Sequence, residues 1–174
     1  MLTNILRRRY YYFMSFLKDK SVKNSYDDLR KQALNIKPDD IGLILDNNEQ
    51  VYGAIVDIPA ENEMVTLVCI FDGTVSLYFS NGGGALGLGQ KYEEIRQAGV
   101  SFLFSAGQTI PYLSQTADFD KSKNEKTSVC LLVRDGIYKA QFDMSKTENA
   151  EKHIQYLNFL IQNVLSKIRE SGAL

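Results

Sequence analysis

The chain has 174 residues, of which 44% are hydrophobic and 24% charged, proportions typical of a folded domain rather than of a disordered or fibrous chain. Its 20 Lys and Arg balance 21 Asp and Glu to a net charge of -1, which excludes the broad basic field that nucleic-acid binding needs. At this length one core forms without a metal or disulfide, so we expect residues 1–174 to make a single domain.

The first twenty residues combine a basic cluster with aromatic side chains. Apolar residues recur there at spacings of three and four, which predicts an amphipathic helix over about 3–18. The apolar run after Arg7–Arg9 is about eight residues long, short of the roughly 20 that span a bilayer, and no small-residue cleavage site follows. We favour a packing helix with a basic face in water. Its surplus aromatic surface also fits a dimer contact, and contact with an anionic membrane stays an alternative.

Two further patterns precede the middle of the chain. A second helix is predicted from Ser25, as N-cap, to about Ile36, with Asp27 and Asp28 in the first turn where the helix dipole favours negative charge. Short apolar runs separated by turn residues then predict an antiparallel meander of four strands at 41–45, 51–58, 64–71 and 74–79. The third run is apolar at nearly every position, so we expect both of its faces to be covered.

The second half predicts one long helix over 90–115, bent near Gly107 or Pro111, and a polar loop over 117–126. Two strands at 127–133 and 137–143 then flank Asp135-Gly136, a pair that suits a type I′ hairpin turn. A last helix spans about Thr147–Glu170. The expected fold is α+β: about six mainly antiparallel strands, a four-strand meander plus the C-terminal hairpin, with helices packed on the sheet as in an α/β/α sandwich.

The segment between the meander and the long helix is the most unusual of the chain, because five of its nine residues (81–89) are glycine. The spacing G-x-G-x-x-G is present, but the segment follows an antiparallel meander and lacks the acidic residue that a dinucleotide site places about 20 positions later. Exposed amides of Asn81, Gly82, Gly83 and Gly84, with Lys91, are candidate ligands for a small anion or a phosphate-bearing metabolite. The alternative is a structural bend that requires glycine.

Few other residues suggest chemistry. His153, the only histidine, lies beside the apolar stripe of the last predicted helix and is expected at the core boundary. Cys69 and Cys130 lie in predicted strands as buried, inert thiols, and two cysteines with one histidine this far apart do not suggest a zinc site. Asp57 follows an apolar run and is expected to face inward, whereas the other acids of 39–63 fall in turns. We predict no catalytic set, no metal and no cofactor.

Two resemblances bear on function. The stretch Ser76–Gly84, with the sequence SLYFSNGGG and a glycine-punctuated helix start after it, resembles a segment of bacterial proteins of similar size without an assigned activity, over mainly residues 41–115. This likeness implies a bacterial, cytoplasmic origin and no catalytic residue. The succession of helices around an antiparallel sheet is similar to the profilin and roadblock modules, which implies an interaction platform.

Together these observations favour a cytoplasmic, non-enzymatic binding or assembly module with a protein partner, or a homodimer, and no transmembrane segment. The alternative is a protein that binds a small anionic ligand at residues 81–89.

Overall fold

The computed structural model describes residues 26–121 and 125–174. Its elements, in chain order, are α2 (Tyr26–Leu34), the 3-10 helix η1 (Pro38–Ile41), β1 (Gly53–Pro59), β2 (Met64–Ile70), β3 (Val75–Phe79), β4 (Gly84–Ala85), α3 (Leu88–Lys91), α4 (Glu93–Ala106), the 3-10 helix η2 (Gly107–Tyr112), β5 (Ser114–Gln115), β6 (Thr127–Val133), β7 (Gly136–Phe142) and α5 (Lys152–Glu170). The strands form one sheet in the order β4-β3-β2-β1-β6-β7-β5, with every neighbouring pair antiparallel. The expected α+β class is confirmed.

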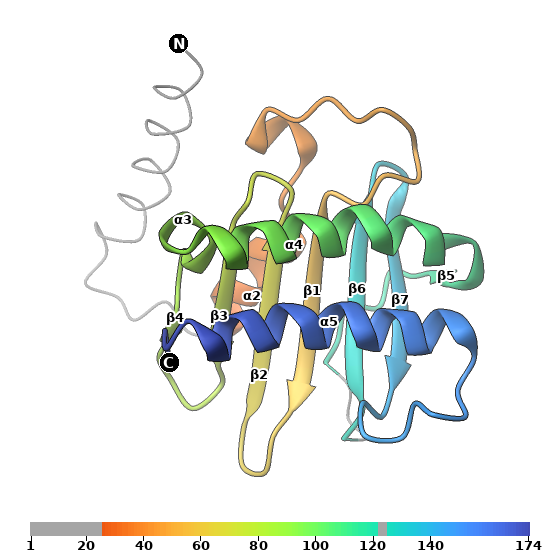
Figure 1. The fold of residues 1–174 in the computed structure, drawn as a ribbon. Helices are drawn as coiled ribbons and strands as arrows, with labels where there is room; N and C mark the ends of the chain where they lie inside the picture. The colour runs from red at the N-terminus through yellow and green to blue at the C-terminus, as the bar shows by residue number, and fades with distance from the viewer. Residues whose placement is uncertain (1–25, 122–124) are drawn as a thin grey trace.

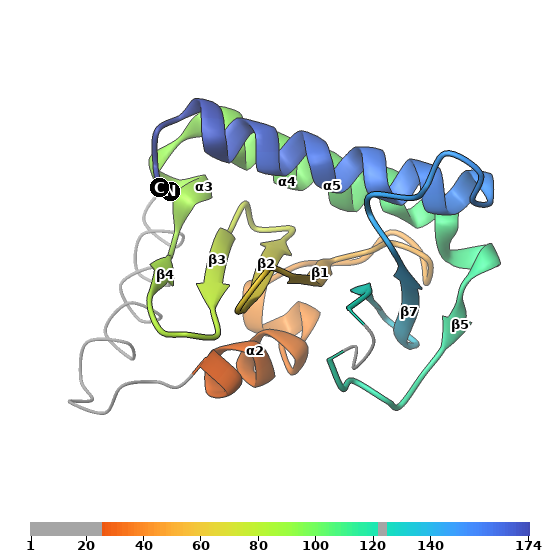
Figure 2. The same ribbon diagram turned by 90° about the horizontal axis from the view of Figure 1, so that it is seen from below.

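The sheet is covered differently on its two faces (Figures 1 and 2). Helices α4 and α5 lie side by side along one face, and α2 lies on the other. Because successive residues of a strand point to opposite faces, β1 sends Ala54 and Val56 to the core under α4 and α5 and Ile55 to the core under α2. In β2, Leu67 and Val68 divide in the same way, so the expectation that this strand is covered on both faces is confirmed.

The prediction of a strand at residues 41–45, the first of the meander, is wrong. Residues 42–50 form turns and irregular chain after η1, with Gly42 in the left-handed conformation at φ 64. Pro38 at the start of η1 and the hydrogen bond from Lys37 N to Asp40 Oδ2 favour this tight turn over an extended run. Leu45 is nevertheless buried in the core under α2. The apolar pattern of residues 41–45 therefore belongs to a segment that covers this core, not to a strand.

Two short edge strands, β4 and β5, raise the strand number from the expected six or so to seven. Each has only two residues, too few to produce an alternating pattern in the sequence. The meander consequently has four strands, β1 to β4, but they begin at Gly53 and end at Ala85.

The predicted helices are corrected in their bounds. The helix expected over 90–115 is divided: Tyr92, at φ -127, separates α3 from α4, and the chain tightens to the 3-10 helix η2 from Gly107, where the bend was expected. The last helix begins at Lys152, five residues later than about Thr147, and ends at Glu170 as predicted.

The C-terminal hairpin is confirmed, since β6 pairs with β7 from Val133 opposite Gly136. Its turn residues, Arg134 and Asp135, both have negative φ, and only Gly136 has a positive value, 144. The type I′ turn is therefore wrong, because that turn needs positive φ at both central residues.

The helix predicted over 3–18, the N-cap role of Ser25 and part of the polar loop (122–124) lie outside the described residues.

Candidate functional site

The glycine-rich segment forms the β3–β4 hairpin and the approach to α3. Asn81, Gly82, Gly83 and Gly84 are exposed at the hairpin, and the exposed Lys91 ends α3. The hairpin and α3 lie at opposite ends of β4 (Figure 1), so the structure does not bring Lys91 to the loop. Helix α3 has four residues, and so few aligned peptide dipoles make a weak anion site. Ligand binding at this segment stays a prediction.

Two of these glycines have clear structural reasons. Gly84 has φ 147 and pairs with Tyr78, and a Cβ there would overlap the carbonyl oxygen of Leu77. A Cβ on Gly89 would overlap the carbonyl oxygen of Gly73. The bend from strand to helix therefore depends on backbone segments that approach more closely than any side chain allows.

The single histidine and the two cysteines do not form a nucleophilic pair. His153 is partly buried in α5, where its ring stacks on Tyr112 with centroids 5.3 Å apart and its Nε2 lies 3.3 Å from a Glu151 carboxylate oxygen. Cys69 and Cys130 are free and buried, and burial raises the pKa of both thiols, that of Cys130 to about 11. The boundary position of the histidine and the burial of the thiols are confirmed.

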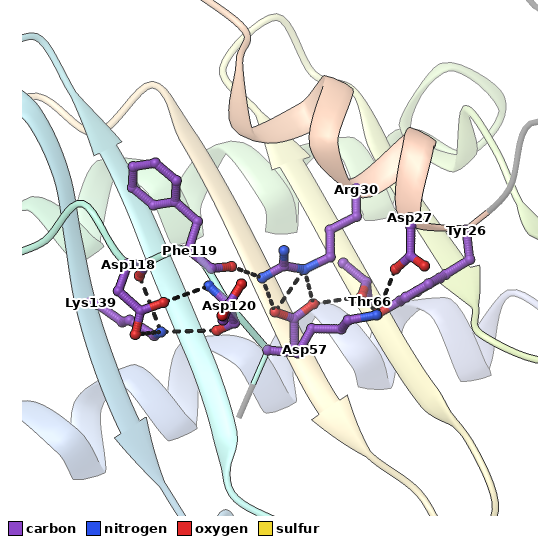
Figure 3. Close-up of polar contacts among 10 residues, drawn as sticks. Tyr26, Asp27, Arg30, Asp57, Thr66, Asp118, Phe119, Asp120 and Lys139 are labelled. Atoms are coloured by element: carbon purple, nitrogen blue, oxygen red, sulfur yellow. Dashed lines mark hydrogen bonds and ion pairs between the residues drawn. The ribbon is translucent and has the colours of Figure 1, made fainter. Parts of the chain in front are cut away.

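Asp57 forms the most buried charged contact of the described residues (Figure 3). Its carboxylate accepts hydrogen bonds from Arg30 Nε at 2.9 and 3.0 Å and from Arg30 Nη2 at 2.6 Å, while the two residues are 0% and 7% exposed. Burial acts to lower the pKa of Arg30, but the hydrogen bonds and charge of Asp57 outweigh it and raise that pKa. Arg30 therefore stays charged, and the pair ties α2 to β1. The expectation that Asp57 faces inward is confirmed.

A short hydrogen-bond chain continues from this ion pair to Tyr26, the first residue of α2. Thr66 on β2 lies opposite Asp57, and its Oγ1 donates to Asp57 Oδ1 at 2.7 Å. The hydroxyl of Tyr26 lies 2.6 Å from the same Oγ1. Burial raises the pKa of Tyr26 to about 12, so the phenol remains protonated at neutral pH. The acceptor positions of Asp57 are thus occupied by the fold itself.

Two cations, Arg30 of α2 and Lys139 of β7, hold residues 118–120 against the sheet. Arg30 Nη2 donates to the carbonyl oxygen of Phe119 at 2.6 Å. From β7, Lys139 Nζ donates to the carbonyl oxygens of Asp118 and Asp120 at 3.2 and 2.9 Å. Lys121 Nζ, in turn, lies 2.6 Å from Asp27 Oδ1 on α2. Figure 3 shows these contacts converging on one side of the sheet.

A hollow of about 640 Å³ opens between α2 and residues 117–121. Its charged lining consists of three cations and three carboxylates: Arg30, Lys31, Lys121, Asp27, Asp118 and Asp120. Opposite charges in equal number do not select an anion or a cation. We therefore interpret the polar network as the anchor of α2 and of this segment.

Ser128 on β6 is the other neighbour of Asp57 across the sheet. It is fully buried, and its Oγ has no hydrogen-bond partner among the residues that the structure describes. A nucleophilic serine needs a base within hydrogen-bond reach, and Asp57 is already bonded to Arg30 and Thr66. In the described part of the chain, no group of three or more His, Cys, Asp or Glu is placed to hold a metal ion.

The opposite side of the molecule offers a different kind of surface. Buried positions of α4 and α5 face the sheet, and the positions most distant from the sheet form one stripe on each helix. We call these stripes together the α4–α5 outer face. Its exposed members, including the first turn of η2, are Glu93, Gln97, Ser101, Phe104, Gln108, Lys152, Gln155, Phe159, Asn163 and Glu170, with the charged ones at the helix ends.

Large aromatic side chains protrude from this face and beside it. Phe104 is 76% exposed and Phe159 is 66% exposed, and Tyr112 of η2 is 69% exposed. The helices also lack charge there, because residues 97–117 and 154–166 contain no Asp, Glu, Lys or Arg. Exposed aromatics without charged neighbours are typical of the centre of a protein interface.

Sequence reasoning located both helices and their buried stripes but missed this face. The usable signal is the pair of long charge-free runs, which a chain with 24% charged residues seldom contains at exposed helix positions.

No protein-family model, no curated protein and no solved structure matches this chain. The resemblances of Ser76–Gly84 and of the overall architecture therefore stay predictions. Among the described helices, none combines the length and apolar character that a bilayer-spanning segment requires.

Proposed function

We propose that the protein is a non-enzymatic binding or assembly module that works through protein–protein contact on the α4–α5 outer face. The observation that carries the proposal is the exposure of Phe104 and Phe159 on neighbouring helices, each within a run, 97–117 or 154–166, that contains no charged residue. Leaving aromatic rings in water forfeits the free energy of burying them, so a contact that covers both rings is favourable.

The reactive side chains are either engaged in hydrogen bonds or buried, which supports a binding role rather than catalysis. Asp57 is engaged by Arg30 and Thr66, and the thiols of Cys69 and Cys130 are buried with raised pKa values. Free, buried thiols also fit a reducing compartment, so we place the module in the cytoplasm.

Site-specific photo-crosslinking in the cells that make the protein tests this proposal. The photoreactive analogue p-benzoylphenylalanine replaces Phe104 or Phe159 in the full chain, and Ile44 serves as the matched control. Ile44 is 88% exposed, and its neighbours Leu43 and Leu45 pack on the α2 side of the sheet.

Irradiation is expected to give a discrete protein adduct from positions 104 and 159 and none from position 44. Absence of an adduct at both phenylalanine positions contradicts the proposal, and so does the same set of adducts from all three positions.

A further inference from the structure

We infer that the partner on the α4–α5 outer face is a second copy of this chain, bound about a two-fold axis that lies in the plane of contact. The inference rests on the proposed function and adds the identity of the partner. Three features of the face support it: its lack of charge, the antiparallel arrangement of its two helices, and its size.

The lack of charge is the first argument. In a two-fold contact each residue meets the same surface of the partner, so a face with net charge repels its own copy. Between the helix ends the outer face consists of Gln, Asn, Ser and Phe, and its exposed charged residues, Glu93, Lys152 and Glu170, lie at the ends of α4 and α5. Over this central part a partner of opposite charge would find no charged group to pair with, whereas an identical surface meets no repulsion.

The side-chain amides strengthen the same argument. Each Gln or Asn amide carries two donor hydrogens and an acceptor oxygen, so two amides on opposite copies satisfy each other in either orientation. Gln108 of η2 and Asn163 of α5 place such groups on the outer face, while the amide nitrogens of Gln97 and Gln155 already donate within the chain, to Glu93 Oε1 and to the carbonyl oxygens of Glu148 and Ala150. An apolar centre with a self-complementary polar rim is the composition expected of a homodimer contact.

The arrangement of the helices is the second argument. Helices α4 and α5 run side by side in opposite directions along the sheet (Figure 1). A two-fold axis in the contact plane, whether along or across the helices, places each helix of one copy on an antiparallel helix of the other. The result is a four-helix layer between two sheets, a packing that helices favour. Each copy contributes one Phe104 ring and one Phe159 ring to this layer.

The size of the face is the third argument. At about 1.5 Å per residue the 19-residue α5 is about 28 Å long, and two helices about 10 Å apart make a layer about 20 Å wide. This footprint of about 560 Å², which includes the charged helix ends and to which the ridges of the side chains add area, is about 70% of the roughly 800 Å² that each partner contributes to a stable interface.

Light scattering coupled to size-exclusion chromatography tests the inference on the purified full chain. We expect twice the 19.7 kDa mass of one chain at concentrations up to about 100 µM, which populates a dimer even when its Kd is micromolar. The double variant Phe104→Glu with Phe159→Glu is expected to be monomeric, because four carboxylates then meet in one contact. The control Ile44→Glu is expected to remain dimeric.

Unchanged far-UV circular dichroism shows that the double variant is folded. A milder pair, Phe104→Ser with Phe159→Gln, removes the rings without adding charge and is expected to raise the dimer Kd at least tenfold.

A monomeric wild-type chain at 100 µM overturns the inference. If crosslinks at positions 104 and 159 then join a different protein, the proposed function stands without the homodimer. A dimer that both pairs of substitutions leave intact overturns the inference as well, and the absence of crosslinks at both positions contradicts the proposed function.

Discussion

At the scale of single residues, the ion pair of Arg30 and Asp57 controls how α2 is attached. Arg30 and Ala33 of α2 are buried, and Tyr26, Leu29 and Leu34 pack, partly buried, against the core beneath the helix. The salt bridge to Asp57, the hydrogen bond between Tyr26 and Thr66 and the hydrogen bond to Phe119 add to these apolar contacts. The geometry of such a network is specific, but removal of one charged partner destabilises the fold because the other charge then stays buried without a counter-charge.

The first prediction concerns this pair. Asp57→Asn leaves the buried Arg30 guanidinium without its counter-charge and is expected to lower the free energy of unfolding by about 3–5 kcal/mol. Urea denaturation followed by circular dichroism measures the change. The matched control is Glu170→Gln at the exposed pair with Lys167, where solvent screens the charges and we expect no measurable change. Equal effects of the two substitutions would contradict this account.

The second prediction concerns alkaline pH. Burial raises the pKa of Tyr26 and Tyr78 to about 12 and, with the charge of Asp57, that of Cys130 to about 11. In the unfolded chain these phenols and this thiol titrate near 10 and 8.5. Between the unfolded and the folded pKa values the unfolded state binds fewer protons than the folded state. The stability that these three groups contribute is therefore complete below about pH 8.5 and is lost as pH rises towards 12.

Urea denaturation at a series of alkaline pH values measures this loss of stability. Tyr78→Phe removes one titrating group and is expected to make the decline between about pH 10 and 12 shallower. Tyr112→Phe, at an exposed phenol, is the control and is expected to leave the decline unchanged. A wild-type protein that is equally stable at pH 8 and pH 11 would contradict the prediction.

At the scale of elements, the bend from β3 through β4 to α3 depends on close backbone contacts. Gly89→Ala directs a methyl group at the carbonyl oxygen of Gly73 and is expected to cost about 1–3 kcal/mol. Gly107→Ala is the matched control: Gly107 is helical at φ -53, and the nearest atom to an added Cβ is 3.4 Å away. There we expect no loss, or a gain of about 0.5 kcal/mol.

Thermal denaturation of both glycine variants tests whether the bend requires glycine at position 89. A neutral Gly89→Ala would show that the bend tolerates a side chain, and the structural reason for that glycine would fail.

At the scale of the whole molecule, one sheet carries a core on each face. Leu131 and Leu132 are adjacent in β6 and both are fully buried, but Leu131 packs under α4 and α5 and Leu132 under α2. Each leucine-to-alanine change is expected to cost about 2–5 kcal/mol. Because the two cores share their strands, both variants are expected to shift a single unfolding transition.

Near-UV and far-UV circular dichroism, which report tertiary packing and secondary structure, are expected to give coincident curves for both variants. A variant in which one signal is lost before the other would show that the two faces unfold separately.

The sequence alone determined the local features of this fold, because they depend on periodicity and turn chemistry within a few residues. The alternation and apolar runs of β1, β2, β3, β6 and β7, the hairpin between β6 and β7 and the buried stripe of α5 all have this origin. The inward position of Asp57 was also predictable, since it interrupts an apolar strand.

Only the tertiary structure decided which distant residues meet. The partnership of Arg30 with Asp57 joins positions 27 residues apart, and the anchoring of Phe119 by Arg30 joins positions 89 apart; no local pattern encodes either. The apolar run at 41–45 became a cover rather than a strand because Leu45 packs under the sheet. The α4–α5 outer face, likewise, exists only because two helices far apart in the chain lie side by side on one face of the sheet (Figure 2).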